Sequence, residues 1–115
     1  PVLPWNNYAW SKLGGECAVR MYKNSLILRV CMTEKPFVHK KAFTNVKLNF
    51  AFHEDIAKIL FKLIKRKGIL NLGGKTRTAF NFARKYNPKV KKIRSKGEFP
   101  LNAYMNLSKL KKIVN

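Results

Sequence analysis

The feature that most constrains the fold is a helical pattern leading directly into an almost continuous apolar run. Apolar side chains recur at helical spacing from Tyr8 to about Lys23. Asn6 or Asn7 is placed to cap this helix. Residues 25–31 then form an apolar segment typical of strands buried on both faces of a parallel sheet. A helix followed by such a strand predicts an α/β fold.

Local signals along the rest of the chain predict further helices and strands. We expect, in order, an irregular stretch with a short strand at 46–50, a helix at 54–67 with a C-cap at Gly68, a strand at 69–72, a glycine turn, a helix from Thr76 or Thr78 to Asn87, and a last helix after Asn106. Gly14 and Gly15 lie inside the first helix. Because each glycine costs about 1 kcal/mol of helix propensity relative to alanine, we expect that helix to pack closely against another element.

The charge is strongly positive and unevenly distributed. The formal net charge is +20, and residues 58–115 carry 17 basic residues against Glu98 as the one acid. A basic segment of this kind binds nucleic acid by neutralising phosphates and releasing their counterions. A small nucleic-acid-binding protein is therefore one open function class. Lysine far outnumbers arginine and is the poorer bidentate reader of phosphate, so a solvated basic surface fits the composition equally well.

Membrane insertion and secretion are not expected. No apolar run approaches the about 18 residues of a membrane span. A basic amphipathic helix at 54–67 lying on a membrane is disfavoured by its acidic first turn. Two cysteines do not make a disulfide framework, so a reducing, cytoplasmic location is expected. Pro1 stands where an initiator Met would, which suggests that a longer chain precedes it.

Two patterns with known chemistry are poorly matched. The cysteines and histidines show no paired metal-ligand spacing, so no metal site is expected: Cys17, Cys31, His39 and His53. Residues 68–76 read Gly-Ile-Leu-Asn-Leu-Gly-Gly-Lys-Thr, but the first glycine stands one position too early for a P-loop. A plain glycine turn is the better interpretation.

The more promising pair is Tyr8 and Lys12. Four residues apart, they stand on one face of the predicted helix. A nearby ammonium favours the phenolate form of a tyrosine, which suits the phenol to proton exchange with an alcohol or ketone. Any helix can carry this spacing, so a packing Tyr8 beside a solvated Lys12 remains the alternative.

The segment around this pair resembles a known active-site helix. It reads Pro4-Trp-Asn-Asn-Tyr8-Ala-Trp-Ser-Lys12-Leu-Gly-Gly-Glu16 and is similar to that helix in extended short-chain dehydrogenase/reductases. The form is that of dTDP-dehydrorhamnose reductases and similar nucleotide-sugar reductases and epimerases. The resemblance continues in the same order along the chain, at residues 26–29, 53–57, 68–74, 99–102 and 106–110.

The resemblance implies a role for each residue of the pair. Tyr8 would donate a proton to a sugar ketone, while Lys12 would favour its ionisation and bind the nicotinamide ribose. Hydride would come from NAD or NADP in its reduced form. Further site residues implied by the resemblance are Val30 and Cys31 for the cofactor, and Met32, Thr33 and Asn102 for a nucleotide-diphosphate sugar.

The resemblance also implies a domain organisation. Residues 1–31 would be the active-site helix and the last part of a Rossmann-like dinucleotide-binding domain, and residues 32–115 a small mixed α/β substrate-binding domain. The family's glycine-rich dinucleotide loop lies far upstream of its tyrosine, and only seven residues precede Tyr8 here. We therefore expect a C-terminal portion of such an enzyme that needs an upstream Rossmann domain or subunit and is inactive alone.

Overall fold

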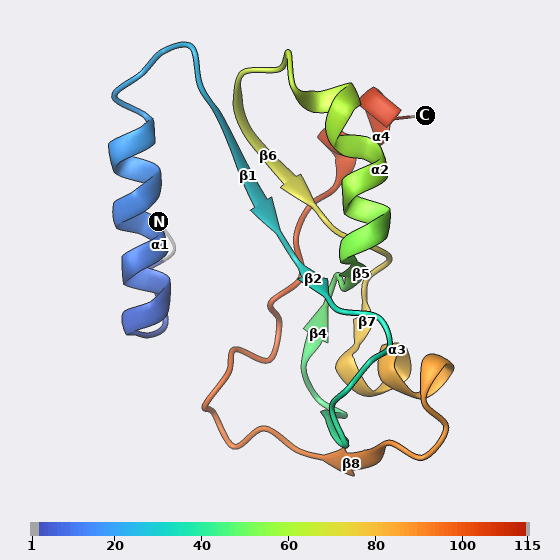
Figure 1. Ribbon diagram of the computed structural model, residues 1–115. Coiled ribbons are helices and arrows are strands. Elements are labelled where there is room, and N and C mark those ends of the chain that lie inside the picture. The colour runs from blue at the N-terminus through green and yellow to red at the C-terminus, as the bar shows by residue number, and fades with distance from the viewer. Residues whose placement is uncertain (1–2, 115) are drawn as a thin grey trace.

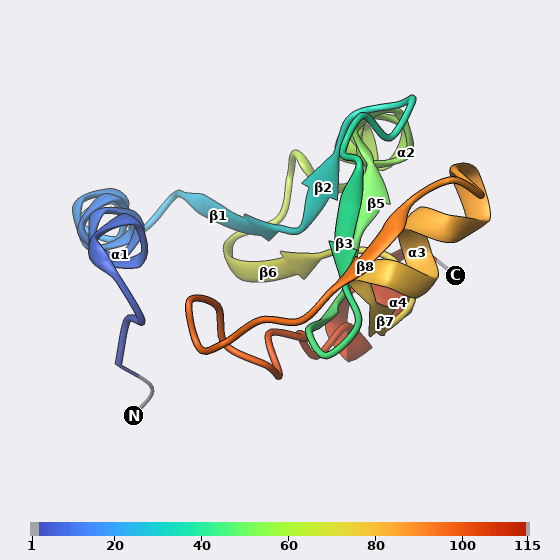
Figure 2. The same cartoon turned by 90° about the horizontal axis from the view of Figure 1, so that it is seen from below.

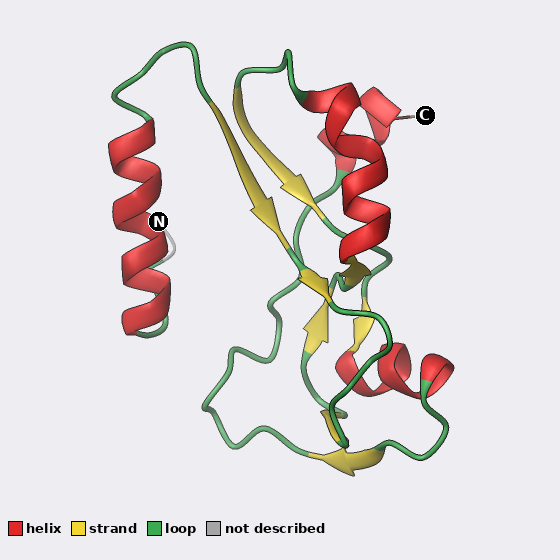
Figure 3. Cartoon of the chain, in the orientation of Figure 1, coloured by secondary structure: helices red, strands yellow, loops and turns green. Residues whose placement is uncertain are grey.

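The computed structural model describes residues 3–114 as a mixed α/β chain, which confirms the predicted fold class (Figures 1 and 3). The elements, in chain order, are α1 (Asn7–Val19), β1 (Leu26–Val30), β2 (Met32–Thr33), β3 (Lys41–Phe43), β4 (Lys47–Leu48), β5 (Ala51–Phe52), α2 (His53–Leu63), β6 (Gly68–Leu72), β7 (Arg77–Thr78), α3 (Ala79–Tyr86), β8 (Lys91–Ile93) and α4 (Ser108–Val114).

Helix α1 stands apart from the rest of the chain (Figures 1 and 2). Asn6 caps it as predicted, its side-chain oxygen accepting a hydrogen bond from the amide of Ala9 at 2.9 Å. No residue of α1 is buried. A Cβ on Gly14 or Gly15 would meet nothing within 4 Å, so the expected close packing of these glycines is wrong within residues 3–114. No described element lies against that face of the helix.

Strands β1 and β6 form the longest ladder. They run parallel, with Leu26 opposite Gly68 and Val30 opposite Leu72. Helices α2 and α4 pack against this ladder around one buried cluster: Ile56, Leu63, Leu70, Leu72 and Leu110. Within the described chain β1 has β6 as its only strand neighbour, so the opposite edge of β1 is unpaired.

Helix α2 is shorter than the sequence predicts. It ends at Leu63, which is fully buried, while the next residue, Ile64, is 72% exposed. The apolar face that would hold a further turn against the core therefore stops at Leu63. Gly68 does adopt a left-handed φ of 94°, but it begins β6 and does not cap α2.

The remaining strands form three short ladders around a second core. Strands β2–β5 and β3–β8 pair in parallel and β4–β7 pair antiparallel. They enclose a cluster rich in phenylalanine and alanine: Phe37, Ala42, Phe52, Ala79, Phe82, Ala83 and Val90. Thr78 caps α3 by accepting from the amide of Asn81 at 3.1 Å, and the helix ends before Asn87 as predicted.

Asn49 joins three separate segments in the interior. It is 1% exposed, donates to the carbonyl of Gly74 at 2.9 Å and to Oγ1 of Thr76 at 2.8 Å, and accepts from the amide of Met105 at 2.7 Å. A Cβ on Gly74 would collide with the carbonyl oxygen of Phe50. The glycines therefore serve a close backbone approach, and the strand β7, not a helix, follows them. This arrangement is not that of a P-loop.

Candidate functional site

Tyr8 and Lys12 lie together beside a hollow. Nζ of Lys12 is 5.4 Å from the centre of the Tyr8 ring. Both side chains line a hollow of about 500 Å³ that also includes Val30 and Met32. Tyr8 is 70% exposed, so a ligand in the hollow can reach its phenol. The two groups face one space and are not part of a packed core.

A bidentate ion pair between Glu16 and Arg29 joins α1 to β1 beside this hollow. Nε of Arg29 donates to Oε1 of Glu16 at 2.7 Å, and a terminal guanidinium nitrogen donates to Oε2 at 2.9 Å. The hydrogen bonds from Arg29 hold the pKa of the Glu16 carboxyl below its ordinary value of 4.5. Because Glu16 lies one turn beyond Lys12, this pair turns the face of α1 that carries Tyr8 towards β1.

The other residues implied for the site lie in different surroundings. Val30 and Met32 line the hollow with Tyr8. Cys31 lies between them, its amide bonded to the carbonyl of Leu72 at 3.0 Å, and burial raises the pKa of its thiol. The lining of the Tyr8 hollow among the described residues does not include Cys31. Cofactor binding by this residue stays a prediction.

A second, aromatic hollow begins at Met32. It has a volume of about 550 Å³, and Met32 and Thr33 line it together with rings and a lysine: Phe37, His39, Lys41, Phe43, Phe50 and Phe99. Phe43 and Phe99 lie with ring centres 5.4 Å apart. Since Met32 lines both hollows, the two spaces adjoin there. This hollow is mainly apolar, with Lys41 as its charged side chain.

Asn102 is exposed and lies between residues that line the aromatic hollow. It forms an isolated parallel bridge with Lys47, while Pro100 and Ala103 line that hollow. Its own side chain is in neither of the two linings within the described chain. Its contact with substrate therefore stays a prediction.

The sequence alone did not identify several residues of the site. Arg29 left a visible signal, because a charged residue interrupts an otherwise apolar strand. Met105 left none: it lines the Tyr8 hollow from a distant irregular segment. The phenylalanines were evident, but the sequence did not predict that they would border one hollow.

No group of three or more His, Cys, Asp or Glu side chains that could hold a metal ion occurs in residues 3–114. No helix of the described chain is long and apolar enough to cross a membrane.

Comparison with known proteins gives fold likenesses only. No known protein-family profile matches the chain, and no curated protein sequence matches it. A solved hypothetical dTDP-4-dehydrorhamnose reductase from Sulfolobus tokodaii matches 100% of the chain, with a TM-score of 0.79 and 22% identity. A dTDP-4-dehydrorhamnose reductase from Bacillus anthracis, in complex with NADP, matches 96% of the chain, with a TM-score of 0.76 and 18% identity.

The resemblance stated from the sequence is therefore confirmed for the fold. The chain spans about half the length of these two structures, 50% and 49% respectively. A likeness at this level of identity describes the fold, and function rests on the residues of the site.

Proposed function

We propose that this chain is the C-terminal portion of an NAD(P)-dependent nucleotide-sugar reductase or epimerase. The observation that carries the proposal is the position of Tyr8 and Lys12, with the ammonium 5.4 Å from the phenol ring and both beside one hollow. The dTDP-4-dehydrorhamnose reductases that share the fold support the same reaction class.

Tyr8 is proposed as the proton donor. Its hydroxyl gives a proton to the oxygen of a sugar ketone, and the charge of Lys12 stabilises the phenolate that remains. Positioned acid catalysis of this kind contributes about 10²- to 10⁴-fold to a rate. Arg29 and Glu16 are proposed as positioning residues, because their ion pair orients the helix that carries Tyr8.

An upstream domain is proposed to complete the site. Residues 1–31 would end a dinucleotide-binding domain, and residues 32–115 would bind substrate. Two observations support this division: the outer edge of β1 is unpaired in the described chain, and α1 exposes large apolar side chains, Trp10, Leu13 and Val19 among them. A parallel strand beside β1 and an element packed on α1 would cover both surfaces.

The residues present fit only part of NAD(P). One of the structures with this fold is described in complex with NADP. When bound, NAD(P) supplies the hydride. Lys12 and Val30 line a hollow with room for the reactive end of the cofactor, and Lys12 can donate to ribose hydroxyls. The glycine-rich loop for the pyrophosphate would belong to the upstream domain.

The nucleotide is proposed to occupy the aromatic hollow. A nucleotide-diphosphate sugar is elongated, and the hollows that meet at Met32 offer one polar and one aromatic compartment. Phe43 and Phe99 suit a flat base, and Lys41 suits a phosphate. Thr33 and Asn102 are proposed to contact the same ligand. A cytoplasmic location is part of this proposal.

Titration with a thymidine diphosphate sugar tests the substrate assignment. Dilute dTDP-glucose is added to the isotope-labelled chain, and amide shifts are followed by NMR. We expect shifts at Val30, Met32 and Phe43, and at least tenfold weaker binding by Met32→Ala. Met21→Ala, which removes an exposed methionine away from both hollows, should leave binding unchanged. Shifts confined to other parts of the chain would contradict the proposal.

Nucleic-acid binding remains the second candidate because one ladder gathers lysines. Lys41 lies opposite Lys91 in the β3–β8 pair, and Lys92 follows. Neither structure that shares the fold is described as binding nucleic acid. Affinity for a short duplex that falls steeply with salt, with the slope of several phosphate contacts, would favour this candidate.

A further inference from the structure

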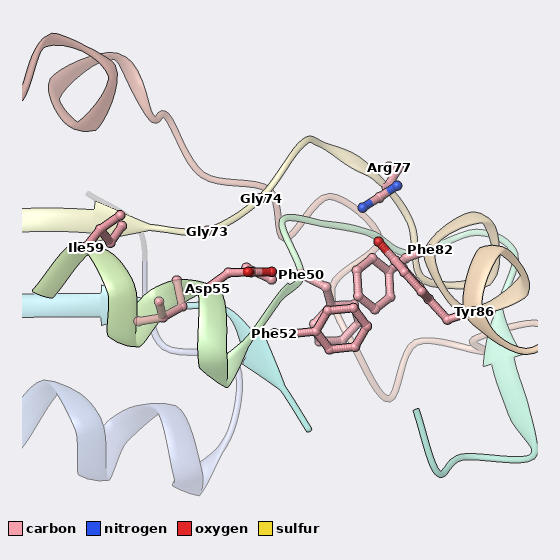
Figure 4. A pocket seen from close by; sticks show the side chains of 11 residues that line it. Phe50, Phe52, Asp55, Ile59, Gly73, Gly74, Arg77, Phe82 and Tyr86 are labelled. Atoms are coloured by element: carbon pink, nitrogen blue, oxygen red, sulfur yellow. The ribbon is translucent and has the colours of Figure 1, made fainter. Parts of the chain in front are cut away.

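A third hollow shares Phe50 with the aromatic hollow, and its lining does not include Tyr8 or Lys12 (Figure 4). It measures about 240 Å³ and is formed by β5, α2, the glycine turn, β7 and α3. Four aromatic rings line it: Phe50, Phe52, Phe82 and Tyr86. Its polar side chains are Asp55 on α2 and Arg77 on β7, which lie towards opposite ends in Figure 4. The proposed reaction uses neither of them.

Arg77 carries a buried donor without a partner. Its Nε–H is shielded from solvent and makes no hydrogen bond in the described chain. Buried polar groups of this kind are nearly always paired, because an unpaired one keeps its full desolvation cost. The guanidinium carbon lies 4.8 Å from the centre of the Phe82 ring, which holds the group over an aromatic face but accepts no N–H bond. Arg77 belongs to neither ion pair within residues 3–114.

A ligand in the hollow cannot reach the shielded Nε–H, so it would pair with the terminal N–H groups of the Arg77 guanidinium, which borders the hollow. A guanidinium prefers an anionic acceptor such as a carboxylate. Figure 4 shows the side chain of Tyr86 extending from α3 towards Arg77, and both residues line the hollow. The rings pack at edge and tilted angles, with centres 4.7 Å apart for Phe52 and Tyr86 and 5.4 Å apart for Phe50 and Phe82. Such walls suit a flat, apolar body.

Size and charge narrow the ligand further. The volume of about 240 Å³ exceeds the roughly 150 Å³ that holds a benzene molecule and lies below the roughly 300 Å³ at which pockets for larger ligands begin. One ring with one small substituent fits within this volume. Asp55 also borders the hollow, but its side chain is 60% exposed and pairs with Lys58 at 3.5 Å, so Arg77 is the charged side chain left to meet a ligand there.

We infer that this hollow is a binding site for a small aromatic monocarboxylate, whose carboxylate meets Arg77 and Tyr86 and whose ring lies among the phenylalanines. The site is separate from the Tyr8 hollow and does not depend on the reductase proposal. Binding there would join α2, β7 and α3 through one ligand, since each of these elements contributes to the wall.

Benzoate and benzamide test the inference on the wild-type chain. The two have the same shape and differ in charge, so the comparison needs no mutant. The side-chain Nε–H signal of Arg77 is followed by ¹H–¹⁵N NMR during titration with each compound. Benzoate should shift this signal together with the amides of Gly73 and Gly74, and should bind at least about tenfold more tightly than benzamide. Equal effects of both compounds, or no shift at Arg77, would overturn the inference.

Substitution provides the second arm. Arg77→Met keeps an unbranched apolar side chain and removes the charge and the donors, so benzoate affinity should fall at least about tenfold. Arg84→Met removes the same charge from an exposed position on α3 and should leave affinity unchanged. If Arg77→Met binds benzoate as the wild type does, the guanidinium is not the recognising group and the site is refuted.

Discussion

The ion pair between Glu16 and Arg29 should control the docking of α1. Helix α1 has no buried residue, so little else in the described chain holds it against β1. We predict that Arg29→Met releases the helix while both cores stay folded. A released helix of 13 residues is only marginally stable in water, so its amides should then exchange faster.

The magnitude follows from geometry and exposure. Hydrogen bonds to charged groups contribute about 1.5–3 kcal/mol when well shielded, whereas exposed ion pairs contribute about 0.2–1 kcal/mol. The Glu16 side chain is 17% exposed and that of Arg29 is 50% exposed. Solvent screening therefore lowers the free-energy contribution of this ion pair. The two short hydrogen bonds keep that contribution near the upper end of the range for exposed pairs, at about 1 kcal/mol. This corresponds to an about fivefold change in the ratio of docked to undocked α1.

Hydrogen exchange of the α1 amides, read by NMR, measures this effect. Glu16→Gln, Arg29→Met and the double variant form a cycle that should yield a coupling free energy of about 1 kcal/mol. Arg66→Met, an exposed arginine beyond α2, is the matched control and should leave α1 exchange unchanged. A coupling near zero would refute the view that this pair holds the helix.

The same contact has a defined pH dependence. Because Arg29 lowers the pKa of Glu16 in the folded state, the contribution is fully present above the ordinary pKa of 4.5. It is lost as the pH falls through the lowered folded value, when Glu16 takes up a proton. Docking that weakens as the pH rises from 5 to 8 would contradict this sign.

Three further predictions concern the interior and the cysteines. Asn49→Ala should lower the free energy of unfolding by about 3 kcal/mol in urea titration, since it leaves buried partners unsatisfied; a loss below about 1 kcal/mol would contradict this. Iodoacetamide at neutral pH should alkylate the exposed Cys17 well before Cys31, whose burial raises the pKa of its thiol; equal rates in the folded protein would show that Cys31 is accessible. Gly74→Ala should destabilise the fold by about 1–3 kcal/mol through its collision with the backbone, whereas Gly14→Ala should increase the helical circular dichroism signal; similar effects at both glycines would be inconsistent with the described packing.

The sequence predicted the longer elements because their signals are local. Asn6 and Thr78 each accept a capping hydrogen bond from an amide three residues ahead, and such caps are visible in the sequence. The apolar runs of β1 and β6 were equally clear. Strands β2, β3, β7 and β8 were missed because each has two or three residues and depends on a partner far along the chain.

The candidate site was predictable only in part for the same reason. Tyr8 and Lys12 are neighbours on one helix, so their spacing predicted that they would share a face. The hollow that Arg77 lines is formed where α2, β7 and α3 come together, and no local sequence pattern predicts which distant elements pack against one another. The prediction that Gly14 packs closely was wrong within residues 3–114. A glycine in a helix suggests close packing, but the sequence does not identify the element that would pack against it.

The most direct test is steady-state turnover in the chain joined to an upstream cofactor domain. NADPH oxidation is followed with a dTDP-4-keto sugar, comparing Tyr8→Phe with Tyr22→Phe, which changes an equally exposed tyrosine outside α1. We expect Tyr8→Phe to lose about 10²- to 10⁴-fold in kcat while Tyr22→Phe retains wild-type turnover, and the isolated chain to show none. Wild-type kcat for Tyr8→Phe would contradict the assignment of this phenol as the proton donor.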